Sequence, residues 1–135
     1  MSDWNGKIIT EFRENDGRVG GQFEGAPLLL LHTVGKKTGQ TRVNPMMYQA
    51  VDGGYAVFAS KGGAPSNPDW YYNLLAHPAV EAEIGTDTVE LVARVADGAE
   101  RERIWTAQKA AYPGFAEYER RTDRQIPVIV LEPAA

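Results

Sequence analysis

Apolar residues recur along the chain at two spacings, one typical of helices and one typical of strands. Near the N-terminus, helical spacing relates four apolar residues, Trp4, Ile8, Ile9 and Phe12. This pattern predicts a first helix within residues 1–16, which Ser2 or Asp3 can cap and which Gly17 can end. We expect its apolar face to pack on the core of the protein.

Six runs have the length and composition of β-strands: Pro27–Thr33, Arg42–Val51, Tyr55–Ser60, Val80–Ile84, Val89–Val95 and Ile126–Leu131. The first run is dominated by apolar residues, which is typical of a strand buried on both faces. Turn-forming residues at 52–54 and 85–87 predict two hairpins, and short hairpin connections imply antiparallel pairing. About six antiparallel strands with few polar edges favour a closed or split barrel.

Three further helices are expected between the strands. Asn67 can cap the first, with Pro68 at its opening position, and this helix runs to about residue 76. Asp97 can cap the second, over residues 99–111, where one stripe holds Ile104, Trp105, Gln108 and Ala111. A short helix over residues 115–121 follows. The chain is therefore predicted to be a single α+β domain, 1–135, with helices flanking a split barrel.

The composition of the chain excludes some kinds of site and argues against others. The chain has 135 residues, a net charge of −4 and no cysteine, so disulfides and thiolate sites are excluded. Its two histidines, His32 and His77, match no metal-ligand spacing, and we expect no metal. Without a long apolar run or a signal peptide, a cytoplasmic location is the default. Contact between the first helix and a membrane surface is only weakly supported, because acidic residues there oppose anionic lipid.

A cationic island stands out on this acidic chain. Between Gly25 and Pro68 the only acid is Asp52, whereas four bases occur: Lys36, Lys37, Arg42 and Lys61. Such local charge is typical of a site for a specific anionic ligand rather than for a nucleic acid. The turn at 35–40 lacks the glycines of a P-loop, and by itself it would be a solvated basic turn.

Two groups of aromatic residues follow this island in the sequence, one directly after it and one near the C-terminus. Residues 60–63 lead into the predicted helix at 67–76, whose first turn carries Trp70, Tyr71 and Tyr72. Tyr112, Phe115 and Tyr118 form the second group, and each group alone would be read as core. Together with the cationic island, the two aromatic groups favour a binding site for a flat, conjugated ligand with a negatively charged tail. No acyl-transfer triad or paired acid and base is present, so a cofactor is expected to supply the chemistry.

Five tracts, taken in order, resemble the deazaflavin-dependent nitroreductase family over about residues 15–133. They are Thr33–Gln40, Arg42–Pro45, Ala59–Ala64, Asn67–Tyr71, and Thr122–Arg124 before Ile126-Pro127. The resemblance implies a split β-barrel like that of flavin-mononucleotide oxidases. It also implies hydride transfer from reduced coenzyme F420, a deazaflavin, to quinones, nitroaromatics or similar acceptors.

The resemblance further implies which residues bind the coenzyme. The phosphate and glutamate tail would lie on Lys36, Lys37 and Thr38. The ring and ribityl chain would run along Arg42, Val43, Asn44, Pro45, Met46 and Met47. The other side would be closed by Phe58, Ala59, Ser60 and Lys61, and by Asp69, Trp70, Tyr71, Tyr72 and Asn73. The acceptor pocket would comprise Met47, Ser60, Tyr112, Phe115 and Tyr118, with Phe115 also against the ring, and no side chain would be a catalytic acid or base.

One departure from the family pattern concerns the acceptor. Members that activate nitroimidazoles carry tyrosine where this chain has Met47 and Phe115, so we expect quinone reduction and poor nitroimidazole reduction. Two alternatives are a flavin-mononucleotide enzyme of the same fold and a non-catalytic F420 carrier. The lysine pair favours the deazaflavin with its anionic tail, and the aromatic trio argues against a carrier. The oligomeric state is open, although split barrels of this kind often pair.

Overall fold

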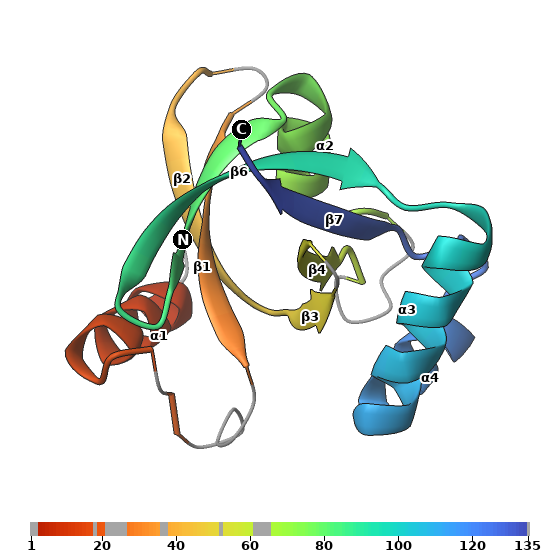
Figure 1. Cartoon of the computed structure of the whole chain (residues 1–135). Helices are drawn as coiled ribbons and strands as arrows, with labels where there is room; N and C mark the ends of the chain where they lie inside the picture. Colours follow the sequence, from red (N-terminus) through yellow and green to blue (C-terminus); the bar gives the residue numbers. More distant parts are fainter. Residues whose placement is uncertain are drawn as a thin grey trace.

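The computed structural model describes residues 3–17, 19–20, 27–35, 38–51, 53–60 and 66–134, and the side chains from residue 6 onward. In chain order the elements are α1 (Asp3–Glu14), β1 (Leu28–Val34), β2 (Thr41–Met47), β3 (Gln49–Val51), β4 (Gly54–Phe58), α2 (Asp69–Ala76), β5 (Ala79–Ile84), β6 (Asp87–Val95), α3 (Gly98–Ala111), α4 (Gly114–Arg120) and β7 (Val128–Pro133). The described strands form one antiparallel sheet in the order β2-β1-β5-β6-β7-β4-β3. The sheet curls, with helices around it (Figure 1), so the predicted split barrel is confirmed.

The predicted run Arg42–Val51 is in fact two strands at opposite edges of the sheet. The chain leaves the β2 ladder at Tyr48, whose N–H donates to the Pro27 carbonyl at 3.1 Å. β2 then pairs with β1, and β3 pairs with β4. The structure describes seven strands where about six were predicted. The difference arises because hydrophobic alternation does not reveal where a strand changes partners.

Both predicted hairpins form. Val51 pairs with Gly54 across the first turn, and Ile84 pairs with Asp87 across the second. Gly53 and Gly85 adopt φ of +79° and +60° in these turns, a region that favours glycine. The last strand begins two residues later than predicted, because Pro127 has no N–H to donate to the ladder. Its carbonyl instead accepts a hydrogen bond from the Ala59 N–H at 3.0 Å.

The first strand, β1, is buried on both faces, as predicted. Leu29 and Leu31 belong to the barrel interior, whereas Leu28 and Leu30 pack beneath α1. A third apolar cluster lies where α3 and α4 cover β4 and β7, and we call it the α3–α4 cluster. Its buried members are Ala56, Phe58, Ala96, Ile104, Trp105, Phe115, Ile126, Val128 and Val130.

The helix ends at Gly17, Asn67 and Asp97 differ in how far they follow the predicted capping. Gly17 does terminate α1: its N–H donates to the Phe12 carbonyl at 2.8 Å with φ of +94°. The prediction that Asn67 caps α2 is wrong, because Pro68 occupies the N-cap position and no side chain caps this helix. Asp97 is at the N-cap of α3, but its side chain makes no capping hydrogen bond. Ala111 is exposed rather than part of the buried stripe.

Candidate functional site

The turn between β1 and β2 is closed by its own backbone. Gly35 N–H donates to the Gln40 carbonyl at 2.8 Å, and Gly39 N–H donates to the Gly35 carbonyl at 2.9 Å. The exposed Thr38 hydroxyl accepts from the Gln40 N–H at 3.2 Å. A Cβ at Gly35 would lie 2.6 Å from that hydroxyl, so a side chain there would displace the Thr38 hydroxyl from this position. The two predicted tail ligands of this turn, Lys36 and Lys37, lie outside the described residues.

The predicted ligands on β2 divide between the two faces of the strand. Arg42, Asn44 and Met46 lie opposite Thr33, Leu31 and Leu29 of β1, so they share the face that turns to the barrel interior. The alternate residues Val43, Pro45 and Met47 occupy the α1 face. Side chains of all six therefore do not converge on one ligand. Among the described strands β2 pairs only with β1, so its outer edge can offer backbone groups.

The end of β4 is buried and tied to neighbouring segments. Phe58, Ala59 and Ser60 are 7%, 0% and 9% exposed. The Arg124 guanidinium donates to the Ala59 carbonyl at 3.2 Å and to the Ser60 carbonyl at 2.9 Å. Lys61, a further predicted ligand, lies outside the described residues. Sequence reasoning assigned no role to Arg124, although it belongs to one of the five tracts of the resemblance.

The residues predicted on α2 play different parts. Trp70 and Tyr71 pack against the barrel interior, Asn73 is buried, and Asp69 and Tyr72 are exposed. Tyr72 accepts a hydrogen bond from the Asn67 amide at 3.3 Å. The first turn of α2 thus presents one acid and one phenol to solvent, with the other aromatics supporting the core.

Four of the five predicted acceptor residues gather on the α3–α4 cluster, and the fifth, Ser60, is not among its members. The Phe115 ring is 9% exposed and lies 5.6 Å from the Phe58 ring and 5.4 Å from the Tyr118 ring, centroid to centroid. Tyr112, Tyr118 and Met47 are half-buried and pack against the same cluster. The structure therefore brings the ends of β2 and β4 together with α4.

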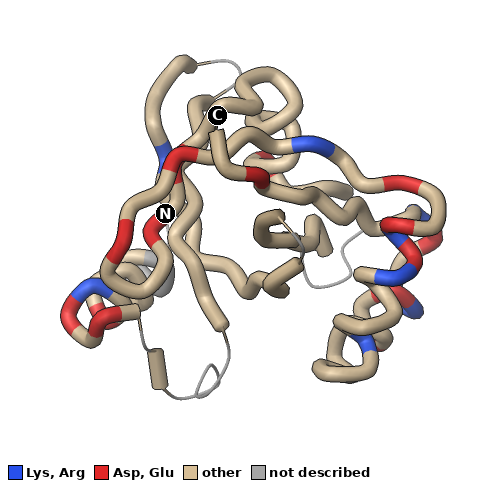
Figure 2. Tube along the Cα trace, viewed as in Figure 1, with Lys and Arg blue, Asp and Glu red and all other residues tan. Residues whose placement is uncertain are grey.

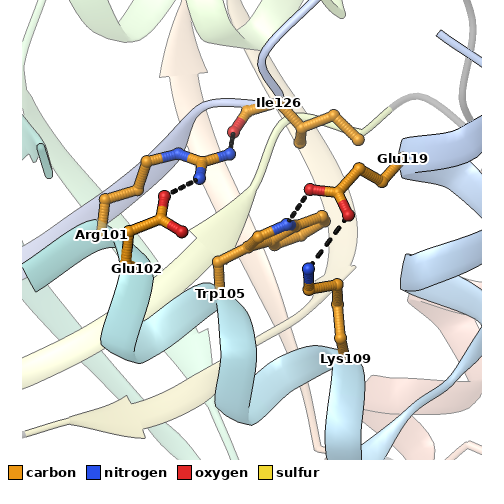
Figure 3. A network of polar contacts seen from close by, with 6 residues as sticks. All are labelled: Arg101, Glu102, Trp105, Lys109, Glu119 and Ile126. Atoms are coloured by element: carbon orange, nitrogen blue, oxygen red, sulfur yellow. Dashed lines mark hydrogen bonds and ion pairs between the residues drawn. The ribbon is translucent and has the colours of Figure 1, made fainter. Parts of the chain in front are cut away.

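A polar network, which sequence reasoning missed, joins α3 to α4 (Figure 3). Glu119 on α4 accepts from the Trp105 indole at 2.6 Å and from Lys109 at 3.0 Å. The indole hydrogen bond, and after it the Lys109 contact, holds the pKa of Glu119 below its ordinary value. Buried Arg101 lies over the Trp105 ring at 5.6 Å and donates to the Ile126 carbonyl at 2.7 Å. The network fixes the helix that carries Phe115 and Tyr118.

Charge is unevenly distributed over the described residues (Figure 2). Acidic residues line the β5–β6 hairpin, including Glu81, Glu83, Asp87 and Glu90, whereas Arg42 is an exposed base on β2. In the described part of the chain no group of three or more His, Cys, Asp or Glu side chains could hold a metal ion. No helix in that part is long and apolar enough to cross a membrane.

Comparison with known proteins gives consistent relatives. F420H(2)-dependent quinone reductase Rv1261c of Mycobacterium tuberculosis (strain ATCC 25618 / H37Rv) is 38% identical over 124 residues, 89% of this chain and 83% of the relative. The structure of F420-H2 dependent reductase FDR-A is 43% identical with a TM-score of 0.72, over 78% of this chain and 94% of its own. A chain from another solved structure, described as a domain-swapped dimer, is 39% identical with a TM-score of 0.73, over 96% of this chain and 98% of its own.

More remote likeness concerns the fold alone. An FAD-binding protein of Mesorhizobium loti is 13% identical with a TM-score of 0.56, over 100% of this chain and 90% of its own. This likeness agrees with the prediction that the chain has a fold like that of the flavin-mononucleotide oxidases. The family model for F420H(2)-dependent quinone reductase matches residues 5–133, nearly the whole chain. The chain therefore belongs to the F420H(2)-dependent quinone reductase family, whose enzymes are oxidoreductases that use coenzyme F420.

Proposed function

We propose that this chain transfers a hydride from F420H2 to a flat, apolar acceptor, with quinones as the main class. Reduced deazaflavin supplies the hydride when it is bound. The observation that carries the proposal is the meeting of Met47, Phe58 and Phe115 on the α3–α4 cluster. Three segments that are far apart in sequence thus meet in one apolar cluster at the end of β2.

The described residues fit such a coenzyme in three respects. The outer edge of β2 can meet the polar rim of a deazaflavin ring with backbone groups. The apolar side chains at the ends of β2 and β4 can cover the face of the ring. Arg42 is exposed and can attract an anionic tail, for which Lys36, Lys37 and Lys61 are further proposed ligands.

The protein contributes positioning and exclusion of water rather than a catalytic acid or base. Half-buried Tyr112, Tyr118 and Met47 are the proposed walls on the acceptor side, and buried Phe115 supports them. Holding two reactants in contact lowers the entropic part of the barrier, and a dry site prevents side reactions. Nitroaromatics are secondary acceptors in this proposal, and bicyclic nitroimidazoles are poor ones because Met47 and Phe115 provide no phenolic hydroxyl.

We propose that the enzyme acts in the cytoplasm. A homodimer is proposed because a relative that is 39% identical forms a domain-swapped dimer. Contact of α1 with a membrane surface is not part of the proposal.

A binding titration followed by a turnover assay tests the function. Fluorescence titration should give a lower Kd for F420 than for flavin mononucleotide, and added salt should weaken F420 binding because the tail contacts are exposed charges. We also expect the enzyme to oxidise F420H2 when quinones from a panel are supplied as acceptors. Equal or reversed affinities would favour the flavin-mononucleotide enzyme. Tight F420 binding without turnover of any quinone or nitroaromatic would favour the carrier.

A further inference from the structure

One arginine between α4 and β7 contacts two segments that lie 57 to 65 residues earlier in the chain. Nη1 of Arg124 donates to the Ala59 carbonyl at 3.2 Å and to the Asn67 side-chain oxygen at 2.6 Å. Nη2 donates to the Ser60 carbonyl at 2.9 Å. The guanidinium therefore spans the chain from the end of β4 to the residue before the N-cap of α2.

These contacts lie just beyond the last paired residue of β4. Phe58 is the last residue of β4 that pairs with β7, and Ala59 and Ser60 continue beyond it. Both residues are buried, so their carbonyls need a donor from within the protein. Arg124 supplies that donor. On the other side Asn67 passes the connection to α2, because its amide donates to the Tyr72 hydroxyl at 3.3 Å.

We propose that Arg124 is a positioning residue for coenzyme binding, an inference that rests on the proposed function. Its fork sets the separation between Phe58–Ser60 and the start of α2, the two segments that are proposed to close one side of F420. A planar guanidinium holds its donors in a rigid fork spread over separate nitrogens, whereas the three donors of a lysine ammonium radiate from one nitrogen on a flexible stem. Loss of the fork should weaken binding of the coenzyme and leave the reaction in the saturated complex nearly unchanged.

The test compares Arg124→Lys with Arg121→Lys, a control at an exposed arginine that follows α4. Both variants keep their positive charge. For Arg124→Lys we expect the Kd for F420 and the KM for F420H2 to rise about tenfold, because hydrogen bonds from a charged group are lost. With saturating F420H2, kcat with a quinone should stay within about twofold of wild type. The control should match wild type in all three constants.

A second variant, Asn67→Ala, tests the inference even if Arg124→Lys does not fold. Asn67→Ala removes one acceptor and leaves both backbone contacts, so its Kd for F420 should rise about threefold while its thermal midpoint changes little. If Arg124→Lys does not fold, an unchanged Kd in Asn67→Ala overturns the inference. Among folded variants, unchanged Kd and KM in Arg124→Lys, or a loss confined to kcat, also overturn it. Wild-type protein that does not bind F420 would instead overturn the proposed function, and the inference with it.

Discussion

Phe115 belongs at once to the core and to the proposed acceptor pocket. Its ring packs against Phe58, Trp105 and Tyr118, so little of its surface is open to a substrate. Half-buried Met47 packs against the same cluster from the end of β2. The two positions at which the resemblance leads us to expect tyrosine in nitroimidazole-activating proteins therefore differ in how easily they can accept a phenol.

This difference leads to a prediction for tyrosine substitutions. Phe115→Tyr should lower the free energy of unfolding by about 1–2 kcal/mol, because its hydroxyl enters an apolar environment, whereas Met47→Tyr should cost less. The double variant Met47→Tyr, Phe115→Tyr should reduce bicyclic nitroimidazoles faster than wild type does. Urea unfolding and steady-state assays would check both parts. High nitroimidazole turnover by wild type would contradict this interpretation of the pocket.

Glu83 should make the stability of the protein depend on pH. Arg13 binds its carboxylate through two nitrogens, at 3.0 and 2.6 Å, and His32 Nε2 lies 2.7 Å from it. The Arg13 hydrogen bonds, and after them the contact with His32, lower the pKa of Glu83. A lowered pKa in the folded state stabilises the protein above the unfolded pKa of about 4.3, and this stabilisation is lost as pH falls through the folded value.

Glu83→Gln should therefore lower the free energy of unfolding by about 1 kcal/mol at pH 7, a modest figure because Arg13 is half exposed. The difference from wild type should shrink as pH falls below the unfolded value and through the lowered pKa of Glu83. Chemical denaturation at a series of pH values measures it. Glu81→Gln, at an exposed carboxylate on the same strand, is the matched control. A constant difference across the pH range would rule out the carboxylate as its source.

At the level of elements, the strands that alternate regularly or are wholly apolar could be predicted, and the changes of partner could not. Residues 28–34 are apolar enough to require burial on both faces, whatever their neighbours. The break at Tyr48 depends on the Pro27 carbonyl, which is distant in sequence. Asn67 has the local chemistry of a helix cap, but the charged Arg124 takes its oxygen. Tertiary hydrogen bonds therefore override local preference at these points.

The same distinction holds for the candidate site. Motifs that are contiguous, such as the turn at 35–40, could be recognised because their chemistry is local. The role of Arg124 and the tie from Glu119 to Trp105 could not, since each joins residues from separate elements. The division of the β2 side chains between two faces follows from strand geometry, but assigning each face required the pairing with β1.

Gly54 should be intolerant of any side chain because β4 and β7 approach closely there. A Cβ at this position would lie 2.2 Å from the Leu131 carbonyl oxygen. Gly54→Ala should therefore lower the free energy of unfolding by about 2–3 kcal/mol through overpacking. Gly6→Ala is the control, since its Cβ would meet nothing within 4 Å, and in a helix it should stabilise by about 0.5–1 kcal/mol. Thermal or urea unfolding would distinguish them, and equal effects would contradict the close approach.

For the whole molecule, the proposed dimer has a direct test. Sedimentation velocity at a series of concentrations should show a species of twice the mass of the 14.8 kDa chain. Obligate dimers should also show a thermal midpoint that rises with protein concentration, because association stabilises the folded state by mass action. A single 14.8 kDa species at every concentration would exclude the dimer.

The place of β7 in the sheet has a consequence for the order in which the chain folds. β7 is inserted between β6 and β4, so among the described strands the β3–β4 hairpin joins the sheet only through a strand about 70 residues later in the sequence. The β5–β6 hairpin is local and can form early, whereas closing the long loop to β7 has a large entropic cost. Until then β4 and β6 expose unpaired backbone edges, which are templates for association between chains. Aggregation during refolding should therefore compete with the arrival of β7, and exchange of this strand between two chains would relieve the same exposure.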